Sequence, residues 1–177
     1  GRATLGGGRA AAFMTYPLPQ IKTGLPARNW FPPEAESAQG LEALRDMGAS
    51  GVIQPLRVVV QLPSGESALS GRRLSGLKAL SDSIEKDPRV REVRGVATLR
   101  PGLSTLQLAM FYSDADSVRL RYPAFFNAYL SADRRTTLID VIAADSVSLA
   151  GMMDLTRHVR RTIASGQRLR GAEIAVG

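Results

Sequence analysis

The sequence predicts an α+β protein, a ferredoxin-like βαβ-βαβ sandwich with a helical insert between its two units. An N-terminal extended segment and a helix are expected before the sandwich. A strand, helix, strand order of hydrophobic periods runs over 56–99 and returns over 136–176, whereas 101–133 between them has a different, helical pattern. Two such units with right-handed crossovers build one sheet that carries both helices on the same face.

Residues 34–177 are expected to form a single domain, and two segments precede it. Residues 1–12 include three consecutive glycines and predict a flexible leader or a cloning remnant. Residues 13–33 hold five prolines, which remove amide donors and fix φ, so this stretch is expected to be extended. A helix is expected over 34–47, because a proline precedes it, acids occupy its first turn and Gly48 follows its end.

The first βαβ unit begins with the strand 56–62, in which apolar residues alternate with others. The period then changes to that of a helix over 70–86, which Asp87–Pro88 ends. The inward stripe of this helix is expected to be Leu74, Leu77, Leu80 or Ser81, and Ile84. A second strand is expected over 90–99, with Gly95 as a candidate bulge.

The insert, 101–133, is expected to be two short helical stretches, around 103–112 and 115–130, with breaks near Asp114 and at Pro123. It holds six of the ten aromatic residues of the chain: Phe111, Tyr112, Tyr122, Phe125, Phe126 and Tyr129. Such a cluster forms either a surface for a hydrophobic ligand or, more commonly, a small satellite core under the insert.

The second βαβ unit begins with the strand 136–144. A helix is then expected from a cap at Asp145–Ser146 to Ala164, with Gly166 as its C-cap, and a last strand over 173–176. The inward positions of this helix are expected to be Leu149, Met152, Leu155 or Thr156, Val159 and Ile163.

The sheet face away from the two helices is expected to be neither fully polar nor fully apolar. From the first strand it would carry Arg57, Val59 and Gln61. From strand 136–144 it would carry one of two sets, either Thr137, Ile139 and Val141 or Leu138, Asp140 and Ile142. Asp140 is expected to face outward and pair with an arginine, in preference to a catalytic role. A half-apolar face on an otherwise ordinary domain suggests packing against a neighbour.

The composition excludes most side-chain catalysis. The chain has no cysteine and one histidine, which rules out thiol nucleophiles, thiolate zinc sites and multi-histidine metal sites. His158 is expected to be a half-exposed helical residue. The stretch SDADS lacks the rest of a calcium loop, so Ser113 or Asp114 is expected to cap a helix. We therefore expect no catalytic residue, no metal ligand and no cofactor.

The net charge of +7, from 23 basic and 16 acidic residues, permits contact with nucleic acid or anionic lipid, but also an ordinary solvated surface. RNA-recognition domains of this fold stack bases on strand aromatics, and the strands 56–62, 90–99 and 136–144 contain none. No nucleic-acid partner is therefore expected.

Four stretches in order carry a family resemblance: TGLPARNWFPPEAESAQGLEALRDMG from Thr23, PLRVVVQLPSG from Pro55, SADRRTTLIDVIAA from Ser131 and LRGAEIAVG from Leu169. They resemble the extracytoplasmic porter-domain loop of the RND superfamily, in particular its MMPL-type exporters of lipids and hydrophobic molecules. An S-x-x-G-x-x-x-L helix of that family is matched by Ser37, Gly40 and Leu44, and its apolar entry segment by FMTYPLPQIK, from Phe13. The resemblance covers roughly residues 15–177.

The resemblance implies a function that the composition alone does not predict. The chain would be a periplasmic loop of a proton-driven exporter in the inner or cytoplasmic membrane, without catalysis of its own. Its partners would be the sister porter domain, the transmembrane helices of the same transporter, and lipid or another hydrophobic substrate. Pro26 and Gly177 would lie at one end of the domain, facing the membrane. The candidate substrate surface in the insert is Phe111, Tyr112, Phe125 and Phe126.

The alternative function is a soluble ferredoxin-like binding module. It would use its basic charge for nucleic acid, or sense a small ligand through sheet dimers.

Overall fold

A computed structural model of the protein describes residue 32 and residues 34–47, 55–166 and 169–177. The expected leader 1–12 and nearly all of the proline-rich segment 13–33 lie outside these residues. The elements are α2 (Glu36–Asp46), β1 (Leu56–Gln61), α3 (Gly71–Glu85), β2 (Val90–Gly95), α4 (Thr105–Phe111), α5 (Ala115–Arg121), α6 (Pro123–Tyr129), β3 (Thr136–Ala143), α7 (Leu149–Ser165) and β4 (Glu173–Val176).

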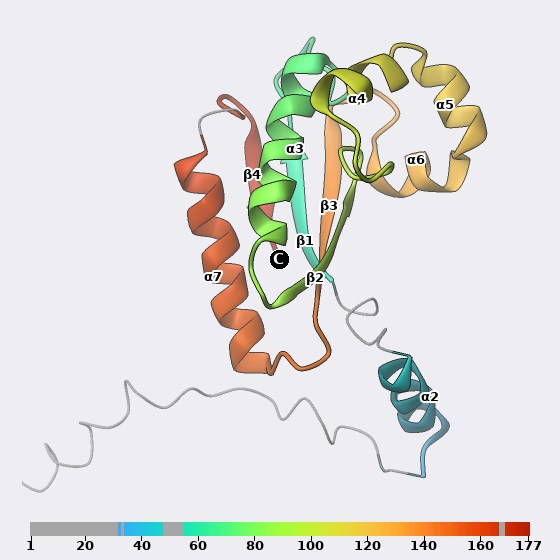
Figure 1. The fold of residues 1–177 in the computed structure, drawn as a ribbon, viewed down its shortest axis with the longest axis vertical. Helices are drawn as coiled ribbons and strands as arrows, with labels where there is room; N and C mark the ends of the chain where they lie inside the picture. Colours follow the sequence, from blue (N-terminus) through green and yellow to red (C-terminus); the bar gives the residue numbers. More distant parts are fainter. Residues whose placement is uncertain (1–31, 33, 48–54, 167–168) are drawn as a thin grey trace, which may run out of the picture.

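The four strands form one antiparallel sheet in the order β2-β3-β1-β4. Each βαβ unit therefore brackets a strand of the other unit, as β3 lies between β1 and β2, and β1 lies between β3 and β4. Helices α3 and α7 cover the same face of the sheet (Figure 1). This is the predicted ferredoxin-like α+β sandwich, and α4, α5 and α6 form the predicted insert between its units.

The core lies between the sheet and the two long helices. Its strand residues alternate, so that Val58 and Val60 of β1 and Ile139 and Val141 of β3 all point toward the helices. From the helices, the core takes Leu74, Leu77, Leu80, Ile84, Leu155 and Val159. Both alternatives on α3 are inward, because Leu80 and Ser81 are both buried. Within the described residues, this core includes no side chain of α2, and Figure 1 shows α2 apart from the sandwich.

Strand β2 is shorter than predicted, ending at Gly95 instead of Leu99. A turn closes there, because the Gly95 amide donates to the Thr98 hydroxyl at 2.9 Å and the Thr98 amide donates to the Gly95 carbonyl at 3.0 Å. The predicted bulge at Gly95 is also wrong, since the register shift lies between Val90 and Glu92. Gly95 instead allows close backbone approach, as a Cβ there would lie 3.0 Å from the Leu138 carbonyl oxygen.

Helix α7 begins later than predicted. Its cap is Ser148, whose hydroxyl accepts from the Gly151 amide at 3.2 Å, instead of Asp145–Ser146. Gly166 is its C-cap, as expected. In the insert, Asp114 caps α5 by accepting from the Ser117 amide at 3.1 Å, which confirms the capping prediction. Pro123 is the first residue of α6. Proline has no amide proton, but an amide at this position has no acceptor within the helix, so no helical hydrogen bond is lost.

The insert and the chain connections lie at opposite ends of the sheet. Arg57, at the start of β1, exchanges two backbone hydrogen bonds with Gly177, of 2.8 and 3.0 Å, so the chain enters and leaves the sheet at one end. The insert joins the end of β2 to the start of β3, where Thr136 pairs with Gln61 at the far end of β1 (Figure 1). Pro26 lies outside the described residues, so its position beside Gly177 stays a prediction.

We expect Leu77→Ala to lower the free energy of unfolding by about 2–5 kcal/mol, because Leu77 is fully buried between α3 and the sheet. Leu106→Ala is the matched control, since Leu106 is 71% exposed and its truncation should cost less than about 0.5 kcal/mol. Urea denaturation followed by circular dichroism measures both. Equal losses in the two variants would contradict the assigned core.

Candidate functional site

The sheet face opposite α3 and α7, called here the open face, is the first candidate surface. Strand register assigns its residues, because Arg57 pairs with Asp140 and Val59 with Leu138. The second of the two predicted sets, Leu138, Asp140 and Ile142, therefore lies on this side of the sheet with Arg57, Val59 and Gln61, although Ile142 is only 1% exposed and adds no accessible surface. The neighbouring strands add Glu92 and Arg94 from β2 and Glu173 and Ala175 from β4.

Asp140 is the centre of a polar network on the open face. It is only 7% exposed, and Arg57 binds it in a bidentate pair, with Nε 2.8 Å from Oδ1 and Nη2 3.2 Å from Oδ2. This confirms that Asp140 faces outward and pairs with an arginine. The Tyr129 hydroxyl, which arrives from α6 in the insert, donates to Oδ2 at 3.1 Å. A buried carboxylate with these three donors is compensated and holds its neighbours in place.

The pKa shifts follow from the same contacts. The hydrogen bond to Asp140, followed by its charge, raises the pKa of Arg57. Burial, and then the Asp140 charge, raises the pKa of Tyr129, so its hydroxyl keeps the proton that it donates. On β2, the hydrogen bonds from Arg94 lower the pKa of Glu92, with donor distances of 2.7 and 2.9 Å. Asp140 and Glu92 are thus each paired with an arginine. Paired carboxylates of this kind suit a contact surface better than a site of proton transfer.

The aromatic cluster of the insert is only partly a surface. Tyr112 and Phe126 are each 4% exposed and belong to the core, which corrects their prediction as surface residues. The physical reason is that three short helices have no core of their own, so they pack their rings on the end of the sandwich. Phe111 and Phe125 are half-buried, and contact of these two rings with a substrate stays a prediction.

Contacts around these rings join the insert to the sandwich. The Tyr112 hydroxyl donates to the Val96 carbonyl at 2.7 Å, just after β2, and burial raises the pKa of Tyr112. The Phe111 ring lies edge-on to Tyr112, with centroids 5.0 Å apart, and the Arg100 guanidinium lies 5.6 Å from the Phe111 centroid. Phe125 stacks on Tyr129 at 4.7 Å, which links this cluster to Asp140 on the open face.

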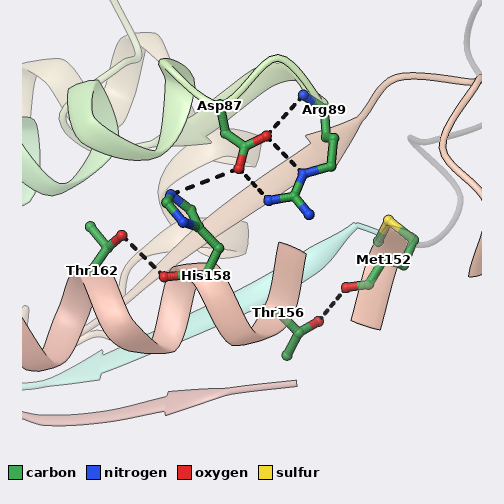
Figure 2. Close-up of polar contacts among 6 residues, drawn as sticks. All are labelled: Asp87, Arg89, Met152, Thr156, His158 and Thr162. Carbon is green, nitrogen blue, oxygen red and sulfur yellow. Dashed lines mark hydrogen bonds and ion pairs between the residues drawn. The ribbon is translucent and has the colours of Figure 1, made fainter. Parts of the chain in front are cut away.

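A second charged cluster ties α7 to the turn between α3 and β2 (Figure 2). Asp87 is buried, and it accepts from the Arg89 amide at 3.0 Å and from the Arg89 guanidinium at 2.9 and 2.6 Å. These bonds to Arg89 lower the pKa of Asp87 to about 2. His158 Nε2 lies 3.7 Å from Asp87 Oδ2. The expected half-exposed helical histidine is thus confirmed, but its carboxylate neighbour could not be predicted from local sequence.

The described residues offer few other sites. A shallow groove of about 230 Å³ lies between α3 and α7, lined mainly by small or apolar side chains such as Ala79, Ser83 and Ile163. In the part of the chain that the structure describes, no three His, Cys, Asp or Glu side chains are grouped so as to hold a metal ion. None of the described helices combines the length and apolar character needed to cross a bilayer.

Comparison of the sequence with models of known protein families and with curated proteins found no match.

Tyr112→Phe tests how the insert is anchored. We expect it to lower the free energy of unfolding by about 1–3 kcal/mol, because the buried Val96 carbonyl loses its only donor among the described residues. The matched control is Tyr122→Phe, since the Tyr122 hydroxyl has no hydrogen bond within the described residues and should cost less than about 0.5 kcal/mol. Chemical denaturation measures both, and equal effects would contradict this anchoring role.

Asp87→Asn tests the second cluster by its dependence on pH. Because the folded-state pKa of Asp87 is lowered to about 2, its ionisation stabilises the fold above pH 4 and this contribution disappears as pH falls toward 2. We expect the variant to be about 2 kcal/mol less stable at neutral pH, with the difference shrinking below pH 4. Denaturant titrations at several pH values measure this, with Asp82→Asn, which removes an exposed pair with Lys78, as control. A difference that does not change with pH would contradict the prediction.

Proposed function

We propose that this chain is the extracytoplasmic porter domain of a proton-driven RND/MMPL-type exporter that moves lipid or another hydrophobic substrate. The observation that carries the proposal is the ordered set of motifs from Thr23 to Gly177. The chain performs no chemistry of its own in this role. Proton movement through the membrane helices of the transporter would drive the export.

The path of the chain through the sheet supports the proposal. A loop domain between two membrane helices needs its entry and exit on the membrane side. Arg57 and Gly177 are bonded neighbours at one end of the sheet, which suits such a position. The insert would then project away from the membrane, and Phe111 and Phe125 would meet substrate that has already left the bilayer, instead of the bilayer itself.

The open face supports the proposed partner. A sheet that is covered by helices on one side only leaves Val59, Leu138 and Ala175 partly or fully accessible on the other. The ion pairs of Arg57 and Arg94 lie beside this apolar centre, on the side toward the start of β1. A sister porter domain, contributed by the other half of the transporter, would cover this face.

The test begins with the gene. The codons on both sides of this segment should encode hydrophobic helices long enough to span a bilayer, of about 20 residues. In the full-length protein expressed in cells, Ala132→Cys, in an exposed turn, should then react with a membrane-impermeant maleimide without cell lysis. Polar flanking sequence would overturn the proposal. Labelling that requires lysis would place the domain on the cytoplasmic side and would also overturn it.

A further inference from the structure

The middle of the open face has a defined shape. Val59 and Leu138 are half-buried and Ala175 is exposed, and together they form an apolar row across three strands. Beside this row, between β1 and β4, a shallow hollow of about 280 Å³ is lined by Val59, Gln61, Glu173, Ile174 and Ala175. A face with an apolar row and an adjacent hollow can receive a side chain that projects from another surface.

Opposite charges lie on the two sides of this row. Toward the chain entry, the Arg57 side chain is 52% exposed, and Asp140 occupies its Nε and Nη2. Within the described residues, Nη1 of Arg57 has no acceptor. Toward the insert end, Glu173 is exposed, and its carboxylate has no hydrogen bond or ion pair with any described residue. The face therefore presents a free donor and a free acceptor, separated by Val59.

We propose that two copies of this chain associate face to face through the open face, about a two-fold axis that passes near Val59. Such an axis makes every contact reciprocal, so Arg57 of each copy enters the hollow of the other and donates from Nη1 to Glu173. It also brings the two apolar rows together. Sheets that pack in this way keep their strands within about 30° of each other.

A second copy fits this face because one chain carries both halves of the complementary charge pattern. Arg57 also remains balanced in the pair, since it is shared between its own Asp140 and the acceptor of the other copy. The inference concerns the chain by itself and does not rest on the transporter role. In a transporter, a sister domain of the same fold would compete for this face.

The first experiment is sedimentation velocity on the 177-residue chain across the micromolar to millimolar range. We expect a reversible dimer that weakens with added salt. Glu173→Arg should weaken the dimer by at least about tenfold, because the new arginine of each copy would face Arg57 of the other copy and the two cations would repel. Glu85→Arg makes the same change of charge on exposed α3 and should leave the dimer intact. A chain that stays monomeric, or equal effects of the two variants, would overturn the inference.

The second experiment uses the absence of cysteine. Ala175→Cys lies close to the proposed axis, and a short bis-maleimide reagent should therefore link two copies, because its span matches the spacing of about 10 Å between packed sheets. Ser83→Cys, exposed on the helix side of the sandwich, is the control. Faster linkage through position 175 supports the proposed face, and equal rates would overturn it. Neither result depends on whether the flanking codons encode membrane helices. The dimer inference can therefore fail while the proposed transporter role stands, and the reverse.

Discussion

The antiparallel register between β1 and β3 is the constraint on which the rest of this structure depends. Side chains alternate along a strand, so a shift of one residue would exchange the two faces of the sheet. The observed register puts Val58 opposite Ile139 and Val60 opposite Thr137, and packs these residues beneath α3 and α7. The same register places Arg57 opposite Asp140 on the other face. The register of β1 and β3 therefore determines both which residues enter the core and which lie on the open face.

Two buried carboxylates show how this fold accommodates charge. Asp140 and Asp87 each lie at a junction, the first between the sheet and the insert and the second between α7 and the α3–β2 turn. Each is bound by an arginine guanidinium through two bonds. The cost of removing a carboxylate from water is offset only where such donors are already in place. The two acids thus connect elements that are far apart in the sequence.

The insert depends on the sandwich for its stability. Its helices α4, α5 and α6 have seven residues each, too short to be stable alone in water. Tyr112 and Phe126 fix them to the end of the sheet by burial, and Tyr129 reaches from α6 to Asp140. Tyr129 therefore connects the insert to the open face by a direct hydrogen bond. This connection links the two surfaces that the proposed exporter would use for its substrate and its sister domain.

The sequence by itself determined the order of elements and the inward faces of α3 and α7, because hydrophobic period depends only on spacing along the chain. It also predicted a helix cap at Ser113 or Asp114, because capping depends on the local sequence, and the structure assigns the cap of α5 to Asp114. Only the tertiary structure decided which residues of β3 share a face with Arg57, because both sets mix apolar and polar residues. Likewise, the structure buries Phe126 and leaves Phe111 half-buried, because the burial of each ring depends on where the insert meets the sheet. The Asp87–His158 contact joins residues far apart in the chain, and no local pattern encodes such a pair.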